Sequence, residues 1–248
     1  MDIVIQINNQ SNGRDKLARL AQYTSRLIWH QLESRNADKY SVDRIKSLEG
    51  TLSSFRKILR LGRCVDTCYT ALNTMHIEDP LLRTCLTTSK IAYALYLYSD
   101  HIVWLTKSGF LKSDSIKWNQ RANKFWLLSI IANLVRDLYE ISHVLNLNKT
   151  TFLKPSALIS SNINSFNMYV GIKYMYAIVN FHRDIFLDTL KNSCDLFIPL
   201  SALGFIKLSP SSVGVLGAVS SIAALITIIK PIMKLVPACV KFTVPKDL

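Results

Sequence analysis

Apolar residues in the N-terminal quarter of the chain recur every three or four positions, which is the period of an amphipathic helix. Between Arg14 and Glu33 they form one stripe, made of Leu17, Leu20, Ala21, Leu27, Ile28 and Leu32. From about Ser41 to Leu61 they form a second stripe, made of Ile45, Leu48, Leu52, Phe55 and Leu59. The pattern therefore predicts two amphipathic helices in this part of the chain.

The polar faces of both predicted helices are basic. Arg19 and Arg26 lie opposite the first stripe; Arg56, Lys57 and Arg60 lie opposite the second, and Arg63 follows them. Such helices lie in a bilayer interface, with the apolar side about 5–10 Å deep among the headgroups and the basic side attracted by anionic lipid. We therefore expect membrane binding through Arg19, Arg26, Leu48, Leu52, Phe55, Arg56, Lys57, Leu59, Arg60 and Arg63. The alternative is that both helices pack their apolar stripes on the rest of the protein, as most amphipathic helices do.

Proline and glycine divide the rest of the chain into further helical stretches. Breaks are expected at Asp79-Pro80, Ser108-Gly109, Lys154-Pro155, Pro199, Ser209-Pro210 and Lys230-Pro231. Proline removes a helix hydrogen bond and disfavours helix in the residue before it. The sequence has no hairpin signal and no sustained alternation of apolar and polar residues. An all-α fold follows, with a helical bundle over residues 80–195.

The most apolar stretch lies near the C-terminus. Leu208 to Ile229 is twenty-two residues without a charge, which at ~1.5 Å per residue is enough to cross a hydrocarbon core of ~30 Å. Two shorter apolar stretches, Ile91 to Thr106 and Phe125 to Val135, leave the number of spans open between one and three. We therefore predict an all-α membrane protein, a single unit over 1–248. It would have basic amphipathic helices over 13–75, a transmembrane helix over 208–229 and a short basic tail over 230–248.

Small residues within the predicted transmembrane helix are spaced four apart, as in membrane helices that approach each other closely. The two pairs are Gly214 with Ala218 and Gly217 with Ser221. They predict self-association; the alternative is that small residues are simply common in membrane helices. Lysines follow the helix more densely than they precede it, which favours a cytosolic C-terminus by the positive-inside rule.

Composition supports a membrane role. Thirty Lys and Arg against seventeen Asp and Glu give a net charge of +13, on a chain whose mean hydropathy is +0.19. Basic nucleic-acid binders are seldom this apolar, and the aromatic residues form no stacking motif, so a nucleic-acid partner is not expected. The five cysteines are scattered and odd in number, which indicates a reducing compartment rather than a disulfide framework.

Catalytic and metal-binding patterns are weak. Cys64 and Cys68 lie one helical turn apart, but a closed zinc site needs four ligands and no second pair is present. Glu140 and His143 have the spacing used in di-iron bundles, yet the second such pair is missing. No phosphate-binding glycine loop or nucleophile elbow occurs. We therefore expect no enzyme, no metal and no cofactor.

Four blocks of sequence are distinctive: GRDKLARLAQYTSR (Gly13 to Arg26), SFRKILRLGR (Ser54 to Arg63), the spacing Asp100-His101-x-x-Trp104-Leu105-x-Lys107-x-Gly109, and SPSSVGVLGAVSS (Ser209 to Ser221). Together they resemble the peroxin eleven family of peroxisomal membrane-elongation proteins. Their order and spacing match over nearly the full chain, with little to match between Asn146 and Asp195.

The resemblance implies an integral protein of the peroxisomal membrane, with cytosolic termini, that elongates the membrane and promotes peroxisome fission, proliferation and size control. It also implies self-association and contact with tail-anchored fission adaptors and a dynamin-related GTPase. The alternative function is a channel for small metabolites, lined by polar groups such as Asp100, Arg136 or Asp137 inside a bundle of the apolar segments. Bilayer conductance and vesicle deformation would separate the two.

Overall fold

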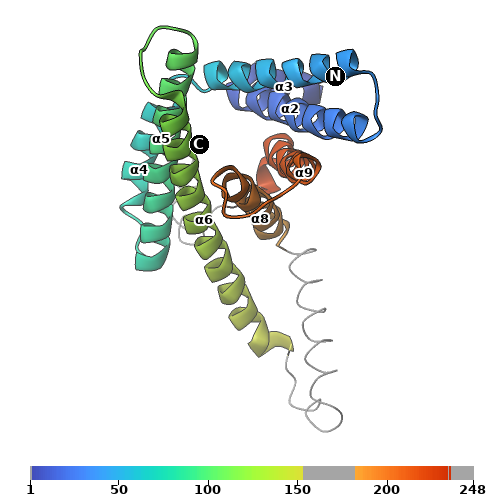
Figure 1. Cartoon of the computed structure of the whole chain (residues 1–248). Coiled ribbons are helices and arrows are strands. Elements are labelled where there is room, and N and C mark those ends of the chain that lie inside the picture. Colours follow the sequence, from blue (N-terminus) through green and yellow to red (C-terminus); the bar gives the residue numbers. More distant parts are fainter. Residues whose placement is uncertain (1, 153–181, 234, 236–248) are drawn as a thin grey trace.

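The computed structural model describes residues 2–152, 182–233 and 235, and over these residues it contains helices and no strand (Figure 1). The helices are α1 (Asp2–Asn9), α2 (Ser11–Ser34), α3 (Lys39–Leu59), α4 (Arg63–Thr74), α5 (Pro80–Lys107), α6 (Ser115–Phe152), α8 (Arg183–Ala202) and α9 (Pro210–Ile229), with a 3-10 turn η2 (Pro231–Met233). The all-α prediction is confirmed. The two amphipathic stretches form α2 and α3, and α4 follows them as a third helix.

Most of the expected breaks are found, and each has a local cause. Asp79 caps α5 by accepting hydrogen bonds from the backbone N–H of Leu81 and Leu82, and Ser209 caps α9 through the N–H of Ser212. Pro80 and Pro210 occupy the first helical position, where a missing N–H costs nothing. After α5 the backbone turns at Gly109, whose φ of 81° suits glycine.

Two expected breaks have other outcomes. The break at Pro199 is wrong, because α8 continues through this proline to Ala202. A proline so close to a helix end leaves few backbone groups without their partners. The break at Lys154-Pro155 lies outside the described residues, as does most of the predicted basic tail.

The helices form two groups that meet along α6 and α8. In one group α4, α5 and α6 pack side by side; in the other α2 packs against α3 and α9, and α9 packs against α8. Contacts between α6 and α8, and between α3 and α5, join the groups (Figure 1). Segments from opposite ends of the sequence, α2 and α9, therefore lie together.

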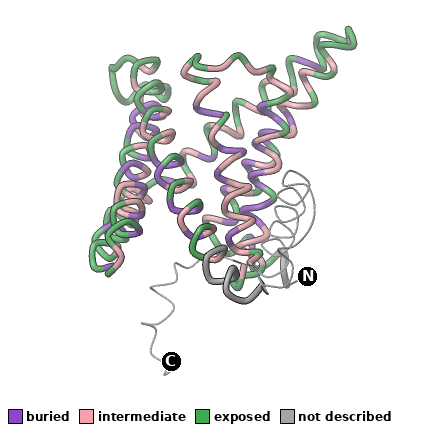
Figure 2. The backbone as a smooth tube through the Cα atoms, turned by 90° about the horizontal axis from the view of Figure 1, so that it is seen from below, coloured by how far each residue is buried: buried purple, intermediate pink, exposed green. Residues whose placement is uncertain are grey.

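The interior is unusually polar. Its buried polar and charged side chains are Asp15, Arg19, Gln22, Ser25, Arg56, Arg60, Ser89, Ser99, Asp100, Ser129, Arg136, Asp137, Glu140, Asn192, Asp195, Ser220 and Ser221. Large apolar side chains meanwhile point outward from every long helix between α2 and α9. Buried and exposed stretches alternate along the helices, as Figure 2 shows.

α9 is the one helix in the described part of the chain that is long and apolar enough to cross a membrane, with a mean hydropathy of 2.2. Its bounds, Pro210–Ile229, agree with the transmembrane helix predicted over 208–229. The other two apolar stretches lie within α5 and α6. By the same measure of length and composition neither of these two helices qualifies as a span.

Candidate functional site: a basic cavity and an outward apolar face

The basic face of α3 points into the protein. Arg56 is buried; its Nε donates to Asp15 Oδ1 (3.1 Å) and its Nη1 to Gln22 Oε1 (2.7 Å). Arg60, one turn later, is also buried and donates to Asp100 Oδ2 (2.8 Å) and to the Tyr96 hydroxyl (2.6 Å). The amphipathic pattern of α3 is therefore present, but its charged side faces other helices.

Asp15 of α2 is the centre of this network. It is almost fully buried, and Arg56, Arg60 and Arg63 all lie within 4.0 Å of its carboxylate. Burial raises the pKa of Asp15, but the positive charges of Lys16, Arg56 and Arg60 outweigh burial and lower it to about 2. The carboxylate is thus a permanent anion surrounded by an excess of cations.

A second carboxylate, Asp100, joins α3 to α5. Lys57 Nζ lies 2.8 Å from its Oδ1, opposite the contact with Arg60. The neighbouring His101 places Nε2 3.0 Å from the Arg60 carbonyl oxygen. The Asp-His pair of the third sequence block therefore anchors α5 to the end of α3.

Arg19 links the N-terminal helices to the C-terminal part of the chain. It forms a buried, two-pronged ion pair with Asp195 of α8. Its guanidinium also lies 5.5 Å from the centre of the Tyr23 ring and 5.8 Å from that of Trp126. Arg–carboxylate forks of this kind hold two elements in a defined register.

A further charge cluster lies between α6 and α8. Arg136 contacts both Asp137 and Asp188, and Lys191 also contacts Asp188. Asn192 donates to Asp137 Oδ2 at 2.6 Å. Of the polar residues suggested for a channel lining, Asp100 and Arg136 face the interior cavity, whereas Asp137 is fully buried beside it.

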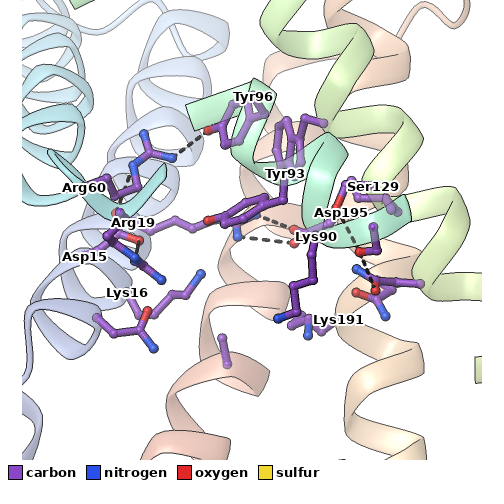
Figure 3. A pocket seen from close by; sticks show the side chains of 18 of the residues that line it. Asp15, Lys16, Arg19, Arg60, Lys90, Tyr93, Tyr96, Ser129, Lys191 and Asp195 are labelled. Carbon is purple, nitrogen blue, oxygen red and sulfur yellow. Dashed lines mark hydrogen bonds and ion pairs between the residues drawn. The ribbon is translucent and has the colours of Figure 1, made fainter. Parts of the chain in front are cut away.

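These clusters surround one cavity of about 620 Å³. Nine basic and four acidic side chains line it, a formal excess of five positive charges. Figure 3 shows Lys16 and Arg19 reaching into it from α2, Lys90 from α5 and Lys191 from α8. The lining of the cavity is therefore basic.

The other residues expected to bind membrane lie as follows. Arg26 pairs with Glu49 (2.6 Å) and is partly exposed. Leu48 and Phe55 point outward, while Leu52 and Leu59 are half-buried. The apolar side chains of the predicted set are thus exposed or half-buried on the outside, whereas its basic side chains Arg19, Arg56, Lys57 and Arg60 lie inside. Lipid contact by these four stays a prediction, and it would require α2 and α3 to separate from their partners.

The small residues of α9 have a neighbour within the chain. A Cβ added at Gly217 would lie 2.3–2.5 Å from ring atoms of Tyr23, and one at Gly214 would lie 3.0 Å from the backbone of α2. Ala218 packs beside them, and Ser221 donates to the Gly217 carbonyl (2.6 Å). Within the chain, Gly214 and Gly217 lie against α2; self-association through this face stays a prediction.

Sequence reasoning missed the carboxylates that neutralise the basic face. Asp15, Arg19 and Gln22 follow one another at helical spacing on α2, which is a detectable signal for an inward polar face. Asp188, Lys191, Asn192 and Asp195 have the same helical spacing on α8, so a comparable signal was present there. In the described part of the chain no group of three His, Cys, Asp or Glu residues could hold a metal.

The helices, the buried charges and α9 define an all-helical protein with a polar interior, apolar outer faces and one candidate membrane span. Residues 1–229 match the family described as Peroxisomal biogenesis factor 11 (PEX11), and the chain belongs to this family. The family is one of peroxisome biogenesis factors.

Curated relatives support the assignment along nearly the whole chain. Peroxisomal membrane protein 11B of Bos taurus is 34% identical, covering 96% of this chain and 100% of its own. Peroxisomal membrane protein 11A of Homo sapiens is 33% identical, covering 95% and 99%. A Dictyostelium discoideum homologue is 24% identical, covering 90% and 91%. These relatives are proteins of the peroxisomal membrane, and no solved structure matches the chain.

Proposed function

We propose that this protein remodels the peroxisomal membrane by inserting the outward apolar faces of α3 and α4 into one leaflet, with α9 as the anchor. The remodelled membrane elongates, which promotes fission, proliferation and control of peroxisome size. Family membership supports the organelle and the membrane. The insertion step is the part argued from geometry.

The observation that carries the proposal is the row of exposed apolar side chains on these two helices. On α3 the row contains Leu48, Phe55 and Ile58; on α4 it contains Val65, Tyr69 and Leu72 at intervals of four and three residues. Phe55 is 46% exposed and Val65 is 69% exposed. Rows of this kind on a folded protein mark membrane or partner surfaces.

The buried ion pairs make such insertion feasible. Burying a Val, Leu or Phe side chain is worth about 1.5–3 kcal/mol, so six half-exposed ones supply on the order of 5 kcal/mol. The basic side chains of α3 form ion pairs with Asp15 and Asp100 inside the protein. The outer face of α3 can therefore enter the bilayer without bringing unpaired charges with it. Material wedged into one leaflet enlarges it and bends the membrane.

The test uses the full-length protein reconstituted into anionic vesicles. We expect the double variant Phe55→Glu with Ile58→Glu to lose tubulation, because two charges would enter the apolar row. Gln31→Glu with Ser34→Glu is the matched control, since both residues are exposed on α2, outside the proposed insertion faces of α3 and α4; it should tubulate like the wild type. Equal tubulation by both double variants, with unchanged helical content, would contradict the proposal.

Partners and topology enter the proposal through the family resemblance. Anionic lipid, further copies of this chain, tail-anchored fission adaptors and a dynamin-related GTPase would act with it. The lysines after α9 support a cytosolic C-terminus. Protease protection on intact organelles tests the topology directly.

A second candidate function is a channel for small metabolites. The polar cavity enclosed by outward apolar helices favours it, because a membrane channel has the same arrangement. Its basic lining predicts selectivity for anions in planar-bilayer recordings of the purified protein. Absence of conductance, with tubulation intact, would remove this candidate.

A further inference from the structure

We propose that the cavity between α2, α3, α5, α6, α8 and α9 binds a small phosphate-bearing anion. This inference goes beyond membrane remodelling, which uses the outer surface of α3 and α4. It rests on the charge balance of the cavity, on hydrogen-bond donors left without partners, and on the cavity's size.

The charge balance leaves cations in excess after every lining carboxylate has been paired. Asp15, Asp100, Asp188 and Asp195 each contact at least one Arg or Lys side chain. No described residue forms an ion pair or hydrogen bond with the Lys16 ammonium, and Arg63 is only 4.0 Å from Asp15. A buried arginine cannot release its proton, so the excess of positive charge at the lining arginines requires a counter-charge, and an anion bound there would also favour the protonated form of Lys16.

Two arginines also present unpaired donors. Arg19 Nε and Arg63 Nη1 are buried, and neither has a hydrogen-bond partner among the described residues. Arg19 is especially informative because its side chain is 5% exposed and its other two nitrogens are occupied by Asp195. An oxyanion in the cavity would accept hydrogen bonds from such donors.

The size of the cavity and the shape of the guanidinium donors that line it favour phosphate. A volume of about 620 Å³ lies within the range of about 300–1,000 Å³ typical of small-molecule sites. Guanidinium forks match phosphate oxygens in pairs. A phosphomonoester carries nearly two charges at neutral pH and offsets more of the excess than a carboxylate does. Water could satisfy single donors but would leave that excess uncompensated.

Two sources supply this chemistry, a soluble phosphomonoester and the headgroup of a phosphatidic acid. Both present the same terminal phosphate, so the cavity chemistry is shared. They differ in whether acyl chains contribute to affinity.

The experiment is isothermal titration calorimetry on the full-length protein in phosphatidylcholine nanodiscs. Glycerol 3-phosphate and dioctanoyl phosphatidic acid are the two probes, and glycerol is the uncharged control. Lys16→Gln and Arg63→Gln, singly and together, remove cations that line the cavity without breaking a close ion pair. Lys124→Gln and Arg14→Gln are the matched controls, because both residues are exposed and lie outside the cavity.

We expect saturable phosphate binding that weakens about tenfold for each cation removed, as charge-assisted hydrogen bonds of this strength imply. The control variants should stay within about twofold of the wild type. Equal affinity for the two probes supports a soluble ligand, and much tighter binding of phosphatidic acid supports a headgroup. The proposal is overturned if neither probe binds, or if Lys16→Gln, which removes a side chain with no close partner among the described residues, binds as tightly as Lys124→Gln.

Discussion

α2 meets its neighbours through two different kinds of interface. Towards α3 and α8 it presents Asp15, Arg19 and Gln22, which form buried ion pairs and hydrogen bonds. Towards α9 it presents Tyr23, against which Gly217 packs so closely that a Cβ there would overlap the ring. Ion pairs and hydrogen bonds define the contacts of α2 with α3 and α8, whereas close packing defines its contact with α9.

The difference shows how a helical bundle with outward apolar side chains and a polar interior is stabilised. Where apolar side chains point outward, the inner contacts cannot rely on burying them, and paired charges take over the role of defining the register. Where no charge is available, as on α9, small residues allow the backbone contact instead.

The largest loss in the free energy of unfolding is expected for Asp15→Asn. The substitution leaves Arg56, Arg60 and Arg63 facing a neutral amide, and removing one partner of a buried charge network costs about 3–5 kcal/mol. The measurement is chemical unfolding in detergent, followed by circular dichroism. Asp43→Asn, on the exposed face of α3, is the control. A loss below about 1 kcal/mol would show that the carboxylate does not organise the interior.

A smaller loss in the free energy of unfolding is expected for Gly217→Ala, which lies at the close contact between α9 and α2. The added methyl would lie within 2.5 Å of Tyr23, and overpacking of this kind costs about 1–3 kcal/mol. Gly50→Ala is the matched control, because nothing lies within 4 Å of its added Cβ. The free energy of unfolding of this control should be unchanged or rise by up to about 1 kcal/mol, since alanine lowers the entropy of the unfolded chain. If Gly217→Ala keeps wild-type stability, α9 does not dock on α2 in this way.

The smallest effect is a pH dependence carried by Lys16. Burial lowers its pKa to about 7; Arg19 and Arg56 act in the same direction, and Asp15 and Asp195 oppose them. Between pH 7 and 9 the unfolded chain holds a proton on this lysine that the folded protein has released. The free energy of unfolding should therefore rise with pH, by at most about 1.4 kcal/mol per unit.

Comparison with Lys16→Met isolates this contribution, because the methionine side chain has no proton to release. The variant should show a flatter stability profile than the wild type between pH 7 and 9. Parallel profiles for the two proteins would mean that Lys16 keeps an ordinary pKa.

The helices themselves were predictable because their signal is local. The stretch expected between Arg14 and Glu33 is α2 (Ser11–Ser34), and that expected between Ser41 and Leu61 is α3 (Lys39–Leu59). Apolar spacing, proline and capping residues act within a few positions, so the sequence carries them directly. Among the described helices, α8 departs from these rules because it continues through Pro199.

The direction in which the helices face was not predictable in the same way. A basic face opposite an apolar face reads identically whether the basic side meets lipid headgroups or the inside of a bundle. The partners that decide between the two lie far away in sequence: Asp15 is 41 positions from Arg56, and Asp195 is 176 positions from Arg19. No local pattern links such residues.

The sequence by itself determined an all-helical chain with a C-terminal helix able to span a membrane, two amphipathic helices before it, and a strong positive excess. Only the tertiary structure decided that part of this excess, five of thirteen positive charges, lines one cavity, and that Gly217 of α9 packs against Tyr23. The reason is physical: helix formation depends on neighbours within a turn, whereas ion pairs and close packing depend on which distant segments meet.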